Sequence, residues 1–172
     1  YLGILSETHV DQTLTPSGTF DSGTIGGNPT SIDTASTVSV FEGMQSVEIQ
    51  YVGGGSNYTG AGINFTASDI SAFSTLSFAI DTSAVADFAD IQIQVQPSIP
   101  PGGSNHNFVW LSGYSPVRID GNWSVYEIPI ADFPDLTLTG LTAIGFFNMS
   151  SSPGESTLIP GVIYLDDIVL IK

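Results

Sequence analysis

Polar and apolar residues alternate along two short segments of the chain. Within Ser46–Val52 the apolar residues Val47, Ile49 and Tyr51 alternate with polar ones, and within Asp90–Gln96 every odd-numbered position is apolar and every even-numbered one is Asp or Gln. A period of two is the pattern of a β-strand that has one face in a core and one polar face. Both segments are therefore predicted to be half-buried strands.

Other short apolar segments, separated by turn-forming residues, predict further strands near Leu2–Val10, Gly62–Thr66, Thr75–Ile80, Asn107–Leu111, Trp123–Ile130, Ala143–Asn148 and Val162–Ile171. Helical periodicity extends no further than about one turn. The polar segment Thr15–Ser36 is expected to be a loop, and Ser150–Pro160 is expected to close a hairpin before the last strand. This recurrence of short strands is typical of an all-β fold, a two-sheet antiparallel sandwich.

The length and composition fit one domain over residues 1–172. A chain of this length can bury one sizeable core, and its 41% of apolar residues opposes disorder. We expect Phe78, Trp123, Ile128 and Phe133 at or near that core. We interpret the chain as a monomeric module excised from a larger secreted multidomain protein.

The charge is strongly one-sided, with 17 acidic residues against Arg118 and Lys172 and a net charge of −15. Such a surface repels phosphate backbones and anionic lipid headgroups, so the expected partners include no nucleic acid and no membrane. It also disfavours anionic polysaccharides but leaves neutral glycans open. Because acidity maintains solubility in salt, we expect an extracellular or cell-surface location, in a bacterium of a saline habitat such as the sea.

The residues needed for catalysis are poorly supplied. Glycoside hydrolysis requires two carboxyl groups that face each other across a sugar, and the five Glu residues form no close group on one strand face. The sequence has two His residues and no Gly-x-Ser-x-Gly motif. We therefore expect that the domain is not an enzyme.

Aromatic and amide side chains are the best candidates for a ligand site. Proteins bind sugars with an aromatic platform for the apolar face of the ring and with polar groups for its hydroxyls. Gln92, Gln94 and Gln96 form an uncharged row on one strand face. The predicted ligand-binding residues are Trp110, Tyr114, Tyr58, Gln94, Arg118 and Asn148. The alternative interpretation is that the aromatic residues belong to the core and that the Gln row faces water.

Calcium is a second possible ligand. Ca²⁺ takes six to eight oxygen ligands from carboxylates and loop carbonyls, and Glu7, Glu42 and the pair Asp166 and Asp167 lie near strand ends and turns. Two adjacent Asp residues in an apolar strand are costly if they are buried without partners. At least one must leave the core or meet a cation, and a solvated strand edge or bulge is the alternative.

Four segments resemble the calcium-binding β-jelly-roll modules of the galactose-binding-like superfamily, which include many carbohydrate-binding modules of glycoside hydrolases. They are Ser6–His9, Glu42–Ile49, Asp120–Phe133 and Tyr164–Ile168, and the last two are the most specific. The resemblance implies a jelly roll. It also implies a structural Ca²⁺ held by Glu7, Glu42 and Asp166, with backbone carbonyls near Thr8 and Gln45.

The function implied by this resemblance is non-catalytic binding of a neutral polysaccharide such as a β-glucan, by which the module targets an attached catalytic domain to its substrate. Two alternatives stay open at this point: a surface or adhesion module that binds protein, and a purely structural accessory domain. An exposed aromatic platform beside the Gln row favours the first function, whereas a broad apolar patch favours adhesion.

Overall fold

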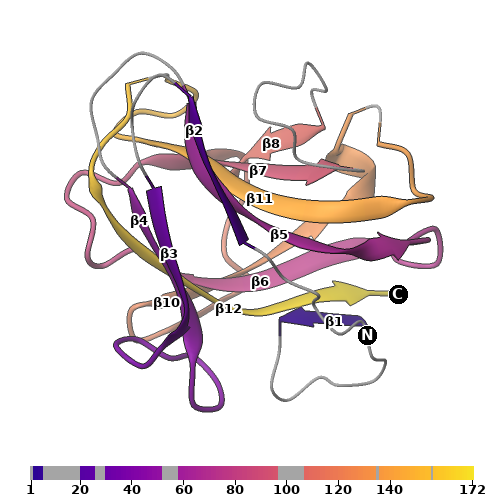
Figure 1. Cartoon of the computed structure of the whole chain (residues 1–172), viewed down its shortest axis with the longest axis horizontal. Helices are drawn as coiled ribbons and strands as arrows, with labels where there is room; N and C mark the ends of the chain where they lie inside the picture. Colours follow the sequence, from indigo (N-terminus) through magenta and orange to yellow (C-terminus); the bar gives the residue numbers. More distant parts are fainter. Residues whose placement is uncertain are drawn as a thin grey trace.

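The computed structural model describes residues 2–5, 20–25, 30–51, 58–96, 107–134, 136–155 and 157–172. These residues form two antiparallel sheets that lie against each other as two layers (Figure 1). The helices of the described segments are two three-residue turns, η1 (Leu111–Gly113) and η2 (Ile130–Asp132). None of the described helices is long and apolar enough to cross a membrane. The predicted antiparallel two-sheet sandwich is confirmed.

The first layer, which we call sheet A, has seven strands. Six follow one another across the sheet in the order β3 (Thr30–Ser36), β4 (Ser46–Tyr51), β12 (Gly161–Ile171), β6 (Thr75–Asp81), β10 (Trp123–Pro129) and β9 (Arg118–Asp120). The seventh, β1 (Leu2–Leu5), pairs with the second half of β12, so the first and last strands lie side by side (Figure 1).

The second layer, which we call sheet B, has five strands. Their order is β2 (Phe20–Ile25), β5 (Tyr58–Ser68), β11 (Leu141–Ser150), β7 (Asp90–Gln96) and β8 (Phe108–Trp110). The chain crosses repeatedly between the layers, since β4 belongs to sheet A and the next strand, β5, to sheet B. Most strand pairs are therefore made between segments that are distant in the sequence.

Alternate residues of both sheets fill the space between the layers. Phe78 and Ile128 are fully buried and Phe133 is 3% exposed, which confirms these three core predictions. Trp123 is also buried, but it lies on the other face of sheet A in a smaller cluster with Ala79 and Tyr164. The ring of Phe41 covers it there, with 5.6 Å between the ring centroids.

Two of the segments that were expected to be loops differ from the prediction. The segment Thr15–Ser36 contains β2 and β3, which are outer strands of the two sheets. The segment Ser150–Pro160 folds back through an antiparallel bridge between Ser150 and Leu158, but it leads from β11 in sheet B to β12 in sheet A, so these two strands form no hairpin with each other. The loop prediction for Thr15–Ser36 was wrong because neither β2 nor β3 shows a clear apolar alternation, and because β2 pairs with the distant strand β5. A hairpin of β11 with β12 was wrong because each of these strands pairs with distant partners in its own sheet.

Candidate functional site

The two faces of β7 differ in chemistry. Ile91, Ile93 and Val95 are buried between the layers, while Gln92 and Gln94 lie on the outer face of sheet B. The side-chain amide of Gln94 donates a hydrogen bond to Oε1 of Gln92. Both side chains are buried, at 5% and 7% exposed, although they lie outside the core between the sheets. The Gln row predicted from the sequence therefore includes two amides that are fixed relative to each other.

An aromatic pair flanks the amides on one side. Trp110 of β8 lies opposite Gln92 in the strand register, and Phe108 lies opposite Gln94. Residues directly opposite each other in an antiparallel pair share one face of the sheet. The rings of Phe108 and Trp110 meet edge to face, with 6.2 Å between their centroids and an interplanar angle of 83°. Both side chains are half-buried, so part of each ring contacts solvent.

A third ring flanks the amides on the other side. Phe147 of β11 pairs with Gln92 and with Gly60 of β5, and it is 1% exposed. Its ring lies against the backbone of two glycines, since a Cβ atom on Gly60 or on Gly145 would come within 1.8 or 1.9 Å of ring atoms. We call the surface formed by Gln92, Gln94, Phe108, Trp110 and Phe147 the glutamine face.

The sequence matches the family model described as carbohydrate binding domain 30 over residues 6–172. The chain belongs to this family. The module is therefore a carbohydrate-binding domain, and the resemblance to carbohydrate-binding β-sandwich modules that the sequence predicted is confirmed. A comparison with curated proteins finds no match.

Solved structures of similar fold include two of family 11 carbohydrate-binding modules from Clostridium thermocellum. One, from a cellulosomal cellulase, is 22% identical with a TM-score of 0.61, and the match covers 90% of this chain and 86% of that one. The other is in complex with a β-1,3-1,4-mixed-linked tetrasaccharide; it is 18% identical with a TM-score of 0.59, and the match covers 99% and 96% of the two chains. A β-1,2-glucanase from Parabacteroides distasonis is 21% identical with a TM-score of 0.57, over 90% of this chain and 23% of the enzyme.

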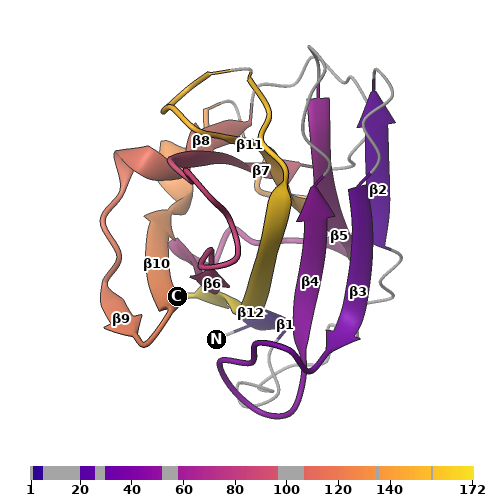
Figure 2. The same cartoon turned by 90° about the vertical axis from the view of Figure 1, so that its left-hand side faces the viewer.

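The structure brings together two of the six predicted ligand residues. Trp110 and Gln94 lie on the glutamine face. Asn148 follows Phe147 at a β-bulge of β11 and has the left-handed backbone angle φ of 53°. The side chain of Tyr58, at the start of β5, lies outside the described residues. Arg118 lies in β9, the outer strand of sheet A at the edge opposite β3 (Figure 2), with its guanidinium 4.6 Å above the ring of Phe41.

Tyr114 lies where the chain leaves sheet B. It follows η1, packs against the core, and donates a hydrogen bond of 3.0 Å from its hydroxyl to Oδ2 of Asp132 in η2. Burial, and then the neighbouring Asp132 carboxylate, raise the pKa of Tyr114 to about 12. The hydroxyl thus links the turn that follows β8 of sheet B to the turn that follows β10 of sheet A.

Asp166, the central residue of the predicted calcium site, lies on the outer face of sheet A. Its Oδ2 accepts hydrogen bonds from the backbone amides of Phe41 and Glu42, at 3.0 and 3.1 Å, and its Oδ1 accepts one from Asp167, at 2.8 Å. Burial raises the pKa of this carboxyl group, and the three amide donors partly oppose that shift. Asp167 forms a bulge with φ of 45°, and Asp166 points to the outer face of the sheet, where it is buried at 3% exposed rather than solvated.

The residues present fit a cation only in part. The segment between β3 and β4 brings the backbone of Glu42 next to Asp166. Oδ1 of Asp166 accepts one hydrogen bond, from the amide of Asp167, and a carboxylate oxygen can accept about two. Within the described residues no three His, Cys, Asp or Glu side chains form a metal-binding group. Glu7 lies outside the described residues, two positions after Leu5, which pairs with Ile168 beside the Asp pair.

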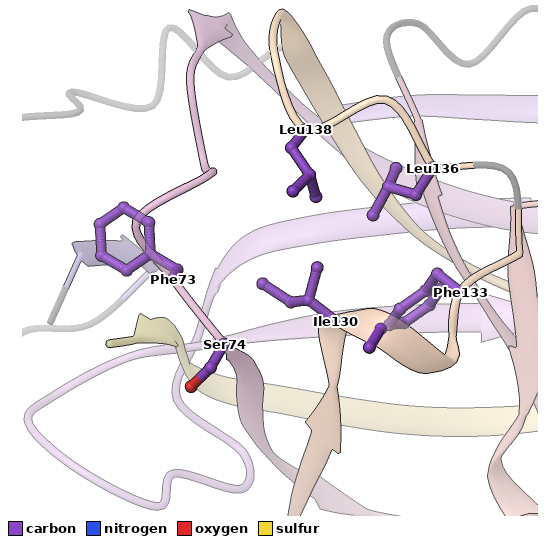
Figure 3. A pocket seen from close by; sticks show the side chains of 7 residues that line it. Phe73, Ser74, Ile130, Phe133, Leu136 and Leu138 are labelled. Carbon is purple, nitrogen blue, oxygen red and sulfur yellow. The ribbon is translucent and has the colours of Figure 1, made fainter.

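A separate apolar groove of about 420 Å³ lies between the segment before β6 and the segment after β10. Figure 3 shows the side chains of Leu136 and Leu138 pointing toward those of Ile130 and Phe133. Ser74 supplies the polar side chain of this lining, as far as the described residues go. The groove lacks the several polar groups that sugar hydroxyls require, so it is a poorer candidate for sugar binding than the glutamine face.

Proposed function

We propose that the module binds a neutral β-glucan on the glutamine face. The observation that carries this proposal is the placement of Trp110 directly beside two hydrogen-bonded amides, Gln92 and Gln94, on one side of sheet B. An aromatic ring offers a surface for the apolar face of a pyranose, and amides can donate to and accept from its hydroxyls. The partly exposed Trp110 ring and the amides beside it supply the two kinds of group with which proteins bind uncharged sugars.

The charge of the chain supports a neutral glycan. With a net charge of −15, the module repels anionic polysaccharides over long range. Arg118, the one internal cation, lies on sheet A with its guanidinium against Phe41. Because the proposed contacts are uncharged, we expect the affinity to change little between low and high salt.

Mixed-linkage β-1,3-1,4-glucan is the first ligand to test, because a family 11 module of similar fold was solved with such a tetrasaccharide. We further propose that the domain is not itself an enzyme and that it targets an attached catalytic domain to its polysaccharide. In support, one similar module belongs to a cellulosomal cellulase. An extracellular or cell-surface location fits this role, since the substrate is a polymer.

We also propose that Ca²⁺ binds beside Asp166, with Glu42 and Glu7 as further ligands. The support is the loop that places Glu42 next to Asp166 and the pairing of β1 beside the Asp pair. When bound, the ion would neutralise the Asp166 carboxylate and hold the segment between β3 and β4 to the sheet. Its role would be structural because it lies on sheet A, whereas the glutamine face lies on sheet B.

Affinity electrophoresis of the isolated module through gels that contain soluble glucans tests the proposed function. We expect mixed-linkage β-glucan to retard the module, and an anionic polysaccharide not to retard it. Repeating the gels with excess chelator separates sugar binding from the calcium proposal. If no neutral glycan retards the folded module, the proposed function is wrong.

A further inference from the structure

Asp90 is a fully buried carboxylate at the start of β7. It shares its strand face with Gln92 and Gln94, because residues two apart in a strand point to the same side. Its Oδ1 accepts hydrogen bonds from the amides of Ile91 and Ser112, both at 2.9 Å. Its Oδ2 accepts from the hydroxyl of Ser112 at 2.7 Å and from the amide of Gly154 at 3.0 Å. These four bonds use the accepting capacity of the carboxylate.

Apart from its neighbour Ile91, the donors to Asp90 lie in two segments at one end of the glutamine face. Ser112 is the middle residue of η1, which begins directly after Trp110. Gly154 lies in the segment that connects β11 to β12. At the start of this segment the carbonyl of Ser150 accepts a hydrogen bond of 3.0 Å from the amide of Ala89, the residue before Asp90. One carboxylate therefore joins the end of the Gln row to the segment that follows Trp110 and to the segment that follows β11.

Trp110 lies at the end of an outer strand of sheet B. It is the last residue of a three-residue strand whose single neighbour in sheet B is β7. It is also the residue before η1, and no side chain caps that turn. The segment after Trp110 is anchored by Leu111, which is buried in the core, and by the two bonds from Ser112 to Asp90, which fix the turn on the face that Trp110 shares with the Gln row. Among the described residues the bonds to Asp90 come from neutral donors, and burial of a carboxylate costs desolvation free energy, which points to a role that a neutral residue fills less well.

We propose that Asp90 is a positioning residue that holds Trp110 in the orientation needed to bind the glycan. This inference rests on the proposed function of the glutamine face. An Asn at this position can accept through one oxygen only, and its Nδ2 would oppose the donating amide of Gly154. Hydrogen bonds to a charged acceptor are also stronger than those to a neutral one. The Asp90→Asn variant should therefore fold, and its Trp110 side chain should be more mobile than in the parent.

The test measures affinity, active fraction and Trp110 mobility separately. In a Trp123→Phe background Trp110 is the single tryptophan, since the chain has two. Calorimetric titration with mixed-linkage β-glucan oligosaccharide should give a Kd raised about tenfold for Asp90→Asn, with an unchanged number of sites. Quenching of Trp110 fluorescence by acrylamide should increase. A merely structural role would lower the melting temperature and the number of sites, and leave the Kd and the quenching unchanged.

Asp81 provides a matched control. It is a buried carboxylate on the outer face of the other sheet, where it accepts from the amide of Ser83 at 2.8 Å and from the hydroxyl of Ser39 at 2.6 Å. Asp81→Asn should lower the melting temperature while the Kd and the quenching of Trp110 stay as in the parent. If Asp90→Asn does not fold, Ser112→Ala removes a single bond to Asp90, and its Kd should rise about two- to threefold.

The outcomes separate this inference from the proposed function. If the folded wild type and the folded Trp123→Phe parent both bind no glucan, the proposed function fails. If the parent binds and Trp110→Ala abolishes binding, while Asp90→Asn or Ser112→Ala binds with the parent Kd and quenching, then the glutamine face stands and the positioning role of Asp90 is overturned.

Discussion

The ring of Phe147 lies against the backbone of Gly60 and Gly145 on the outer face of sheet B. Replacing Gly60 with Ala places a Cβ atom 1.8 Å from the ring and 2.7 Å from the carbonyl oxygen of Phe146, so the backbone as well as the ring must move. Overpacking of this kind costs about 1–3 kcal/mol. At about 2–4 °C per kcal/mol for a chain of this size, calorimetry should show a clearly lower melting temperature.

Gly113 is the control for that substitution. A Cβ atom there would meet nothing within 4 Å, so Gly113→Ala should leave the melting temperature nearly unchanged. Equal losses for Gly60→Ala and Gly113→Ala would show that the close contact between Phe147 and Gly60 has no energetic importance.

Individual residues of the glutamine face were predictable to different degrees. Gln94 was identified because apolar and polar residues alternate strictly along β7, which fixes the face of each side chain. Phe147 was not identified, because it follows Phe146 and two adjacent apolar residues do not reveal which of them points outward. Asp90 was seen only as a polar strand position, since the donors that join it to other segments, Ser112 and Gly154, are 22 and 64 residues away in the sequence.

Among the structural elements, η1 and η2 are joined by the hydrogen bond from Tyr114 to Asp132. The pKa of Tyr114 is raised to about 12 from 10.0, mainly by burial, so the folded protein disfavours the ionised phenol more than the unfolded chain does. This contribution to stability is fully present below pH 10 and is lost as the pH rises toward 12. Tyr114→Phe should remove it, so the stability of the variant should fall less steeply in this range.

Urea denaturation at several alkaline pH values measures this difference. Tyr126 and Tyr164, whose pKa values burial also raises, titrate in both proteins and therefore cancel in the comparison. Parallel curves of unfolding free energy against pH for the two proteins would contradict the account of Tyr114.

The strands were predicted best where they lie in the middle of a sheet. Thr75–Ile80 and Val162–Ile171 were located within one residue of β6 and β12, because buried strands have long apolar sequences. The segments Phe20–Ile25 and Thr30–Ser36 contain Gly, Asp and Ser between their few apolar residues, so the local pattern does not identify them as strands. They become strands through pairing with β5 and β4, and this depends on the tertiary fold.

The stability of the whole molecule should depend on calcium if the ion binds beside Asp166. A ligand that binds only the folded state stabilises it by mass action, so excess chelator should lower the melting temperature of the wild type. Asp166→Ala also removes the acceptor for the amides of Phe41 and Glu42, so its melting temperature falls regardless of the ion. The informative quantity is therefore the shift that chelator causes, which should vanish in Asp166→Ala.

Asp87 is the control for the calcium experiment, because it is exposed and has φ of 58°, which Asn tolerates. Asp87→Asn should keep the full response to chelator. A wild-type melting temperature that chelator leaves unchanged, together with no metal in elemental analysis, would eliminate the calcium proposal and leave the sugar-binding proposal intact.

The central claim is that the glycan binds on the outer face of sheet B, and calorimetric titration of two variants with mixed-linkage β-glucan oligosaccharide tests it most directly. Trp110 and Arg118 were both predicted ligand residues, and the structure places them on different sheets. Trp110→Ala should weaken binding about tenfold or more, because the stacked ring is lost. Arg118→Ala should bind as the wild type does. Wild-type affinity in Trp110→Ala, with weakened binding in Arg118→Ala, would contradict the claim.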